Sequence, residues 1–400
     1  MHQFPDARSV VRALAPDEPV ILNRPHAAAR AARFFAEKFP GRSLYAVKAN
    51  PSPDLIEVLW ANGITHYDVA SIAEARLVRG LLPEAVLCFM HPVKAAGAIR
   101  EAYTQHGVRT FSLDSIEELE KIVEATRGKD GEAAKDLRLC VRLRVSSEYS
   151  ELSLASKFGC DLTEAPVLLQ QCRQYADWLG VCFHVGSQAM TPFAYVQALE
   201  RTRAAIAEAS VVIDMIDVGG GFPSVYPGME PPPLEDYFAI IHRQFEALPI
   251  AYNAELWCEP GRALSAEFSS LIVRVEKRRG DELYINDGAY GALFDAAHVG
   301  WKFPVRALED DLIKPVQDFA FYGPTCDDAD YMEGPFELPS DIQAGDYIEI
   351  GMLGAYGAAM KTEFNGFGSS PRVVVEDEPM ASLYDGSRYR EVRDNVVSLR

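Results

Sequence analysis

Short apolar runs alternate with amphipathic stretches between Arg42 and Arg262. Each run ends in polar or glycine residues, and the stretch that follows carries apolar residues at helical spacing. The runs are SLYAVKAN, THYDVAS, AVLCFM, RTFSLD, RLCVRLRV, GVCFHVGS, MIDVGGG and ELWCEPG. Strands that alternate with helices pair in parallel through right-handed crossovers. Eight such units predict a closed (β/α)₈ barrel. An open doubly wound sheet is the alternative, but no G-x-G-x-x-G follows the first strand.

The pattern changes after Arg262, where strands separated by turns replace the helical periodicity. The new runs are SSLIVRVEKRR, ELYINDG, DFAFYGP, DYIEIGMLGAY and RVVVEDE. They predict a second, mainly antiparallel β domain over residues 266–400. The segment PVILNR near the start is a further strand signal, so we expect residues 1–24 to join this domain. The barrel is then expected to span residues 25–265.

Composition narrows the class of protein. The chain has 400 residues, of which 48% are hydrophobic and 24% charged, as in an ordinary globular protein of two domains. Its net charge of -19 argues against a nucleic acid or an anionic membrane as partner, because both are polyanions. Such acidity suits a cationic small substrate, although solubility alone is the more common reason for it.

The seven cysteines are scattered and several lie inside apolar runs, which is typical of buried free thiols in a reducing compartment. No CxxC pair or His-rich tract suggests a metal site. The first residues lack the apolar core of a signal peptide, and no window approaches a membrane span. We therefore expect a cytoplasmic protein.

In a (β/α)₈ barrel, residues that end the strands gather at the carboxyl face, where the chemistry takes place. Lys48 ends the first run, in YAVKAN. It is either a surface lysine whose stem packs on apolar neighbours or a desolvated amine that forms a Schiff base. Asp68 ends the next run and would orient or neutralise that amine. The alternative role for Asp68 is the N-cap of the helix that begins near Ser71.

The ends of the seventh and eighth strands form the usual phosphate site of such barrels. Gly219, Gly220 and Gly221 follow MIDV directly, and their N–H groups could approach an anion closely. Glu259 and Arg262 follow in CEPGR. A local salt bridge is the structural interpretation of this pair. The functional one sets Glu259 against a pyridinium nitrogen and Arg262 against a phosphate.

Other strand ends add candidates. His184 ends the sixth run in FHVGS, and Ser187 behind it is a potential phosphate ligand. A core histidine bonded to the backbone is the structural alternative. Arg142 alternates with apolar neighbours in CVRLRV, so it should point into the barrel, where it needs an anionic partner.

The second domain contributes two motifs. GPTCDDAD places Cys326 beside Asp327 and Asp328. Because acidic neighbours disfavour the thiolate, a proton donor is favoured over a nucleophile, and an inert residue is the remaining alternative. Tyr356 in GAYGAAM lies between small residues, where a phenol could reach a phosphate or simply pack.

Taken together, YAVKAN, HVGS, DVGGGFP, CEPGR, YINDGAYG, GPTCDDAD and GAYGAAMKTEFNGFG resemble the fold-type III pyridoxal-phosphate decarboxylases. The match runs in order from Tyr45 to Phe367. It is strongest to eukaryotic-type ornithine decarboxylases and their bacterial ornithine/lysine relatives. The resemblance implies an alanine-racemase-like barrel, pyridoxal 5′-phosphate as cofactor, and a homodimer with shared active sites.

The resemblance also implies roles for single residues. Lys48 would bind the cofactor covalently with Asp68 near it, His184 would stack on the ring, and Glu259 would pair with the ring nitrogen. Arg142 would lie near the ring substituents. The phosphate ligands would be Ser187, Gly219, Gly220, Gly221, Gly261, Arg262 and Tyr356. Cys326 would come from the opposite subunit to protonate the substrate carbon, and Asp327 on the same loop would bind the distal amine.

The segment after NDGAYG bears on the choice of substrate. After NDGAYG, which holds Tyr290 as a further candidate contact, the chain is shorter than the ornithine decarboxylases. Asp295 would take the role of their second amine-binding aspartate. Decarboxylation of L-ornithine to putrescine in polyamine biosynthesis is expected, with some activity on L-lysine to give cadaverine. The alternatives are a lysine-preferring enzyme, a diaminopimelate decarboxylase, or an inactive antizyme-inhibitor-like protein that binds a regulator.

Overall fold

The computed structural model describes residues 2–154, 156–309, 312 and 314–384. These residues form two compact units. The barrel unit comprises Ala32–Pro223 and Pro231–Ala263, and the β unit comprises the other described residues. The segment Ser224–Glu230 therefore clusters with the β unit, although it lies between barrel elements in the sequence.

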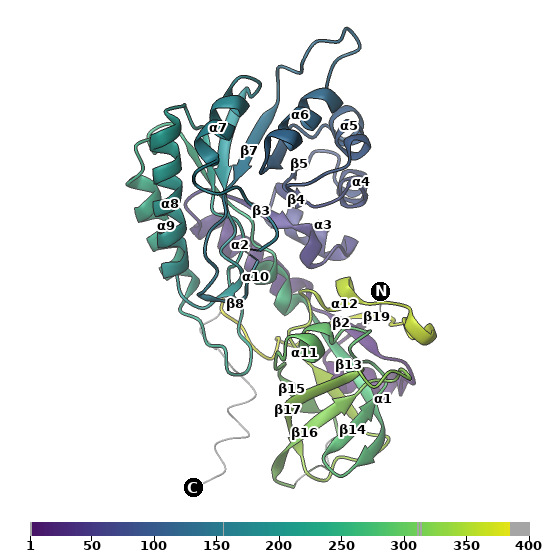
Figure 1. The fold of residues 1–400 in the computed structure, drawn as a ribbon. Coiled ribbons are helices and arrows are strands. Elements are labelled where there is room, and N and C mark those ends of the chain that lie inside the picture. Colours follow the sequence, from purple (N-terminus) through teal and green to yellow (C-terminus); the bar gives the residue numbers. More distant parts are fainter. Residues whose placement is uncertain (1, 155, 310–311, 313, 385–400) are drawn as a thin grey trace. The chain divides into compact units, whose positions relative to one another are not determined.

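Eight parallel strands close the barrel, which confirms the fold class predicted from the repeated pattern (Figure 1). Each predicted run supplies one strand. They are β3 (Arg42–Ala46), β4 (His66–Val69), β5 (Val86–Phe89), β6 (Thr110–Leu113), β7 (Arg138–Arg142), β9 (Trp178–Cys182), β11 (Met215–Asp217) and β12 (Glu255–Cys258). The register pairs Ala46 with Asp68 on adjacent strands, so the residues that end these strands lie at one face.

Helices connect the strands and lie outside them (Figure 1). They are α2 (Pro25–Lys38), α3 (Pro53–Ala61), α4 (Ile72–Leu81), α5 (Ala96–Gln105), α6 (Ile116–Ala125), α7 (Ala165–Arg173), α8 (Phe193–Ala209), α9 (Leu234–Glu246) and α10 (Arg262–Ser265). Two of them begin with the same serine cap. Ser71 accepts a hydrogen bond from Glu74 N, and Ser115 accepts one from Glu118 N. A two-stranded ribbon of β8 (Ser150–Leu152) and β10 (Ser187–Ala189) lies outside the closed barrel.

Sulfur and aromatic side chains fill the barrel interior. Trp257 is buried in one cluster with Leu44, Cys88, Met90, Cys140, Cys182 and Met215. Six cysteines are buried and free, as predicted, and Cys326 is exposed. The thiols thus act as small hydrophobic groups in the core.

The β unit contains a sheet with nine described strands. They are β1 (Gln3–Phe4), β2 (Val20–Asn23), β13 (Ser269–Arg279), β14 (Glu282–Ile285), β15 (Val305–Ala307), β16 (Val316–Tyr322), β17 (Tyr331–Pro339), β18 (Tyr347–Ile350) and β19 (Arg372–Val375). Most pairs are antiparallel, but β1 with β19, β19 with β2, and β14 with β16 are parallel. The helices of this unit are α1 (Ala7–Leu14), α11 (Phe294–His298) and α12 (Gly357–Met360).

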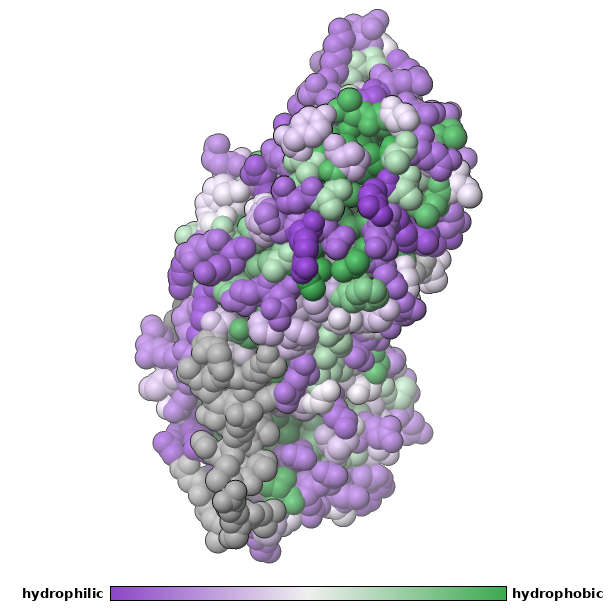
Figure 2. Space-filling model, turned by 90° about the vertical axis from the view of Figure 1, so that its left-hand side faces the viewer, coloured by the Kyte–Doolittle hydropathy of each residue, from purple (hydrophilic) through white to green (hydrophobic). Residues whose placement is uncertain are grey.

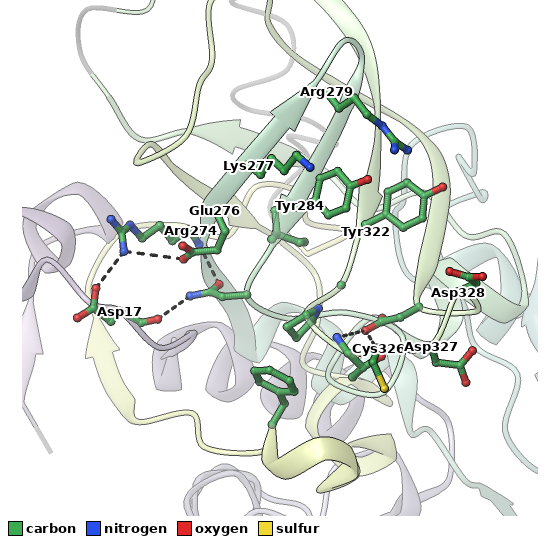
Figure 3. Close-up of a pocket in the computed structure, with 17 residues that line it drawn as sticks. Asp17, Arg274, Glu276, Lys277, Arg279, Tyr284, Tyr322, Cys326, Asp327 and Asp328 are labelled. Carbon is green, nitrogen blue, oxygen red and sulfur yellow. Dashed lines mark hydrogen bonds and ion pairs between the residues drawn. The ribbon is translucent and has the colours of Figure 1, made fainter.

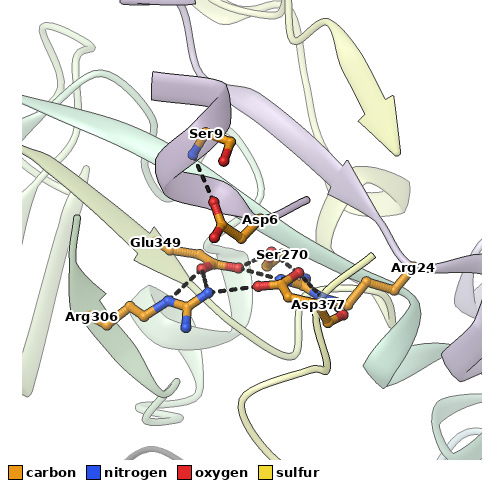
Figure 4. A network of polar contacts seen from close by, with 7 residues as sticks. All are labelled: Asp6, Ser9, Arg24, Ser270, Arg306, Glu349 and Asp377. Carbon is orange, nitrogen blue, oxygen red and sulfur yellow. Dashed lines mark hydrogen bonds and ion pairs between the residues drawn. The ribbon is translucent and has the colours of Figure 1, made fainter. Parts of the chain in front are cut away.

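A buried charge network ties the segment after β19 to the β unit (Figure 4). Glu349 is fully buried and accepts hydrogen bonds from Arg24 Nη2 at 2.9 Å and Arg306 Nε at 2.7 Å. Asp377 accepts from both arginines as well. Burial alone would raise the pKa of Glu349, but the two guanidinium groups hold it at about 2. The carboxylate therefore stays charged and paired, which a buried charge requires.

Hydrophilic side chains dominate the face drawn in Figure 2, and hydrophobic ones form smaller patches between them. Large exposed hydrophobic residues include Tyr252, Val212 and Phe193. None of the described helices combines the length and the apolar character that crossing a membrane would demand.

Candidate active site

Lys48 and Asp68 form an ion pair at the carboxyl ends of β3 and β4. Lys48 lies in a short 3₁₀ turn (Val47–Ala49), and its Nζ donates to Asp68 Oδ2 at 2.9 Å. Asp68 is buried, whereas the Lys48 side chain is 40% exposed. Of the two alternatives for Lys48, the structure shows the partly exposed lysine and not the desolvated amine, because β3 ends at Ala46 and the lysine follows in a turn that leaves the strand. The capping role for Asp68 is also wrong, since Ser71 caps α4.

A second acidic pair lies deeper in the barrel. Burial and the neighbouring charges of Asp217 and Asp68 raise the pKa of Glu259 well above its usual range. Burial raises the pKa of Asp217 to about 8. Glu259 Oε1 and Asp217 Oδ2 are buried, and neither has a hydrogen-bond partner among the described residues. A buried acceptor without a donor is costly, so this site is suited to a ligand that brings a positively charged N–H group.

His184 follows β9 and packs against the glycine run. Its Nδ1 accepts a hydrogen bond from Gly186 N at 3.1 Å. Burial, together with the charges of Arg142 and Lys48, holds the pKa of His184 well below its usual range. The ring is therefore neutral, with its proton on Nε2. The backbone contact matches the structural alternative, and it also fixes the orientation of the ring at this face.

The three glycines after β11 differ in whether their backbone N–H groups are already hydrogen-bonded. Gly219 N donates to Asp217 Oδ1 at 2.8 Å, so this amide is already used. A Cβ on Gly219 would lie 2.0 Å from Phe183 O, and one on Gly220 would lie 3.0 Å from His184 Nε2. The N–H groups of Gly220 and Gly221 have no hydrogen-bond partner among the described residues. Two of the three amides are thus available to an anion, rather than the three expected.

Ser187 and Arg262 lie near each other in the barrel unit. Arg262 is buried, and its Nη2 donates to Ser187 Oγ at 3.5 Å, the long limit of a hydrogen bond. Gly261 allows the loop before Arg262 to pass close to the turn of Lys48, because a Cβ there would lie 3.1 Å from Ala49 Cβ. A guanidinium, a hydroxyl and two free amides make a set of donors that fits a phosphate.

Arg142 is the last residue of β7 and is partly buried. Its guanidinium carbon lies 5.6 Å from the centre of the Phe158 ring. Its charge acts on the pKa of both His184 and Glu259, in each case in the direction expected of a nearby cation. The cation therefore belongs to the same electrostatic environment as these two groups.

In the β unit, Asp330 organises the loop that carries Cys326. Asp330 is 1% exposed, and it accepts hydrogen bonds from Ala289 N at 2.7 Å, Thr325 N at 3.0 Å and Thr325 Oγ1 at 2.7 Å. Its carboxylate thereby links the YINDGAYG and GPTCDDAD motifs. Gly288 and Gly323 both lie against it, and a Cβ on either would come within 2.1 Å of Asp330 Oδ1.

The same two motifs meet at the surface. Tyr290 Oη donates to Asp327 Oδ2 at 2.5 Å, and this bond lowers the pKa of Asp327. Cys326, Asp327 and Asp328 line a pocket of about 880 Å³, which also holds Tyr284, Tyr322, Lys277 and Arg279 (Figure 3). Asp295 lies in the first turn of α11, and Tyr356 precedes α12 with a φ of 58°. The β unit thus presents an exposed thiol beside an ionised carboxylate.

Three residues of these arrangements were not identified from the sequence: Asp217, Asp330 and Tyr195, whose hydroxyl donates to Gly220 O. Asp217 lies within the apolar run MIDV, and a single acid in a predicted core strand was a usable signal. Asp330 stands beside two other acids in DDAD, and Tyr195 stands in a helix, so no local pattern separates them from surface residues.

Comparison with known proteins identifies the family. The family model described as the pyridoxal binding domain of the pyridoxal-dependent decarboxylases matches residues 26–266. The lysine/ornithine decarboxylase of Selenomonas ruminantium is 30% identical over 344 residues, which cover 84% of this chain and 84% of the relative. The ornithine decarboxylase of Cricetulus griseus is 31% identical over 371 residues, which cover 86% of this chain and 77% of the relative.

Solved structures agree in fold over nearly the whole chain. The arginine decarboxylase of Paramecium bursaria Chlorella virus bound to agmatine matches with a TM-score of 0.80 at 25% identity, covering 92% of this chain and 98% of its own. The lysine/ornithine decarboxylase of Vibrio vulnificus complexed with cadaverine matches with a TM-score of 0.78 at 26% identity, covering 94% and 100%. The chain therefore belongs to the pyridoxal-dependent decarboxylases and is an amino-acid decarboxylase whose cofactor is pyridoxal 5′-phosphate.

Proposed function

We propose that the enzyme decarboxylates L-ornithine to putrescine and, more slowly, L-lysine to cadaverine. The names of the two curated relatives, lysine/ornithine decarboxylase and ornithine decarboxylase, support basic amino acids as the substrate class. The bond from Tyr290 lowers the pKa of Asp327, so this carboxylate is ionised near neutral pH and can pair with a distal ammonium group.

The single observation that carries the cofactor assignment is the orphaned, buried Oε1 of Glu259. A pyridinium N–H would satisfy it, and the carboxylate would in turn keep the ring protonated. Bound there, pyridoxal phosphate would supply an electron sink for the decarboxylation. Lys48 would hold the cofactor covalently, and Asp68 orients the amine through the 2.9 Å ion pair.

The remaining barrel residues position the cofactor. His184 would support the ring, and Arg142 would supply positive charge near its substituents. Ser187, Gly220, Gly221 and Arg262 donate to the phosphate, and Gly219 and Gly261 let the loops approach each other closely. Tyr356 of the β unit is an additional phosphate donor.

Cys326 and Asp327 act on the active site of a second copy of the chain. Cys326 is exposed, and its backbone N donates to Asn365 Oδ1 at 3.1 Å. Beside it, Phe364 and Phe367 are 41% and 46% exposed, and the Phe364 ring lies 4.8 Å from that of Tyr290. Exposed aromatic side chains around a reactive loop favour a subunit interface. In this homodimer, Cys326 protonates the substrate carbon.

The distal end of the substrate must be cationic. Asp327 is ionised, and Asp295 is proposed as its counterpart on α11. A carboxylate at this end, as in diaminopimelate, would be desolvated against a like charge at a cost of several kcal/mol. Ornithine and lysine differ by one methylene, which a pocket separates by only about 1–3 kcal/mol. We therefore expect a preference for ornithine rather than strict selectivity.

The test is a substrate panel of ornithine, lysine, arginine and diaminopimelate with wild-type enzyme and Asp327→Ala. Wild type should favour ornithine, use lysine measurably and use diaminopimelate poorly. Asp327→Ala should raise the KM for ornithine and lysine together by at least about tenfold, because a charge-assisted contact is lost. Asp328→Ala, the exposed neighbour, is the matched control and should change neither constant. If Asp327→Ala leaves both KM values unchanged, the distal amine binds elsewhere.

A lysine-preferring enzyme is the second candidate, because the segment between Tyr290 and Asp295 is short and a lysine/ornithine decarboxylase is among the relatives. The same panel distinguishes it, since the order of ornithine and lysine would be reversed. A protein that only binds a regulator would have no need of the Lys48–Asp68 ion pair.

A further inference from the structure

Two tyrosines outside the barrel strands donate hydrogen bonds to the backbone of the two segments that carry proposed phosphate ligands. We call these segments, residues 187–189 and 219–221, the phosphate loops. Tyr195 on α8 is fully buried, and its Oη donates to Gly220 O at 3.0 Å. Tyr237 on α9 is also fully buried, and its Oη donates to Ala189 O at 2.7 Å. Ala189 N in turn donates to Gly221 O at 2.9 Å, so the two loops and the two hydroxyls form one connected network.

A hydrogen bond to the carbonyl of one glycine fixes the direction of the N–H group of the next glycine. In a trans peptide the C=O of one residue and the N–H of the next point in opposite directions. Among the described residues, the peptide bonds at Gly219, Gly220 and Gly221 are trans. Gly219 O accepts from Glu259 N at 2.8 Å, which turns the N–H of Gly220 away from Glu259 N. Gly220 O accepts from Tyr195, which turns the N–H of Gly221 away from the Tyr195 hydroxyl.

The N–H groups of Gly220 and Gly221, which these two bonds orient, are the ones without a hydrogen-bond partner among the described residues. We propose that Tyr195 is a positioning residue for cofactor phosphate binding, because its hydroxyl fixes the peptide that presents the N–H of Gly221. This inference rests on the phosphate site proposed above. Glycine can rotate this peptide easily, and Gly221 already has a φ of 101°, so an external donor is needed to hold one orientation.

The surroundings of Tyr195 suit that task. Its ring stacks on Phe222 at 5.3 Å between centres, which fixes the phenol next to the glycine run. Burial raises the pKa of Tyr195 well above its usual range, so the hydroxyl remains a donor at every physiological pH. Replacement by phenylalanine removes only the donor and leaves the packed ring in place.

The experiment compares binding of pyridoxal 5′-phosphate and of pyridoxal, which lacks the phosphate, to cofactor-free full-length protein. Tyr195→Phe should weaken binding of pyridoxal phosphate by about tenfold, because the N–H of Gly221 is no longer held in place and its hydrogen bond to the charged phosphate is lost. Binding of pyridoxal should stay within about twofold of wild type. Tyr67→Phe is the matched control. Tyr67 is equally buried and donates to a backbone carbonyl, Ile56 O at 3.0 Å, away from the phosphate loops.

Tyr67→Phe should cost similar thermal stability but bind both compounds as wild type does. Equal weakening for both compounds in Tyr195→Phe, or no weakening at all, would overturn the proposal. If Tyr195→Phe does not fold, Tyr237→Phe carries the same test, because it releases the Ala189 carbonyl of the same network. Failure of the phosphate site itself would look different: wild-type protein would then show no preference for pyridoxal phosphate over pyridoxal.

Discussion

At the scale of single residues, two buried carboxyl groups define the interior end of the site. Burial raises the pKa of both groups; the charges of Asp217 and Asp68 raise that of Glu259 further, and the Lys48 and Arg142 cations oppose this effect at Glu259. A carboxyl group whose pKa is raised in this way can lose its proton when a further cation binds beside it. We expect the protonated ring nitrogen of the cofactor to be that cation.

Replacement of Glu259 by glutamine should therefore affect turnover more than cofactor affinity. The amide keeps the shape but not the charge, so kcat per bound cofactor should fall by about a hundredfold or more. The phosphate donors remain, and the cofactor dissociation constant should change by only a few fold. Loss of the cofactor with unchanged turnover per bound molecule would instead make Glu259 a structural residue.

The proton on Asp217 predicts a pH dependence of stability. Its pKa is raised to about 8 in the folded protein, against about 4 for an ordinary aspartate. The folded state thus binds this proton more tightly than the unfolded state does. The free energy of unfolding should therefore fall as the pH rises from about 4 to about 8.

Thermal unfolding of cofactor-free protein at pH 6 and pH 8 checks this dependence. Asp217→Asn should show a smaller decrease in Tm over that interval, because its side chain cannot titrate and can still accept from Gly219 N. Asp328→Asn, at an exposed position, should keep the wild-type decrease. An identical decrease in wild type and Asp217→Asn would show that Asp217 is ionised throughout.

Residue-level prediction from the sequence succeeded where a strand ends and failed inside strands. Lys48 and Asp68 were paired correctly because both end adjacent parallel strands. The exposure of Lys48 was left open between two alternatives, since one residue of turn between strand and lysine decides its environment. Asp217 was missed although a single acid in an apolar run was a usable signal, and its proximity to Glu259, about forty residues later in the chain, arises only from barrel closure.

At the scale of elements, the loop between β16 and β17 depends on Asp330. Asp330→Asn keeps the shape but places an amide donor among the N–H groups of Ala289 and Thr325. We expect the free energy of unfolding to fall by about 1–3 kcal/mol. The decarboxylation rate should fall while cofactor occupancy is retained, because the barrel unit is unchanged.

Denaturant unfolding and absorbance of bound cofactor measure both effects. Asp328→Asn, exposed in the same loop, is the control and should stay within about 0.5 kcal/mol of wild type. Wild-type stability and activity in Asp330→Asn would mean that the loop is held by other contacts.

The sequence predicted all eight barrel strands because each parallel strand, buried on both faces, is a continuous apolar run. It did not identify β15 and β17 in the β unit. The β17 segment YMEGPFELP contains Gly-Pro, which normally ends a strand, and its exposure alternates so that few residues are apolar. The parallel pairing of β1, β19 and β2 was also missed, because it joins the two ends of the chain.

At the scale of the whole molecule, the candidate groups are divided between two units. The barrel unit holds Lys48 and most of the proposed cofactor donors, whereas the β unit holds Tyr356, Cys326 and Asp327. The proposed homodimer joins the barrel unit of one chain to the Cys326 loop of another. An enzyme built this way has two sites, each composed of residues from both subunits.

Mixing two inactive variants tests this account most directly. Lys48→Ala and Cys326→Ala homodimers should each retain little activity, the former below about a hundredth of wild type because no covalent link to the cofactor forms. In the mixed dimer, one site would combine both substitutions and the other would contain neither. Subunit exchange at equal amounts should then restore roughly a quarter of wild-type activity. No recovery, with exchange verified by differently tagged subunits, would contradict the account and mean that each site is built from one chain.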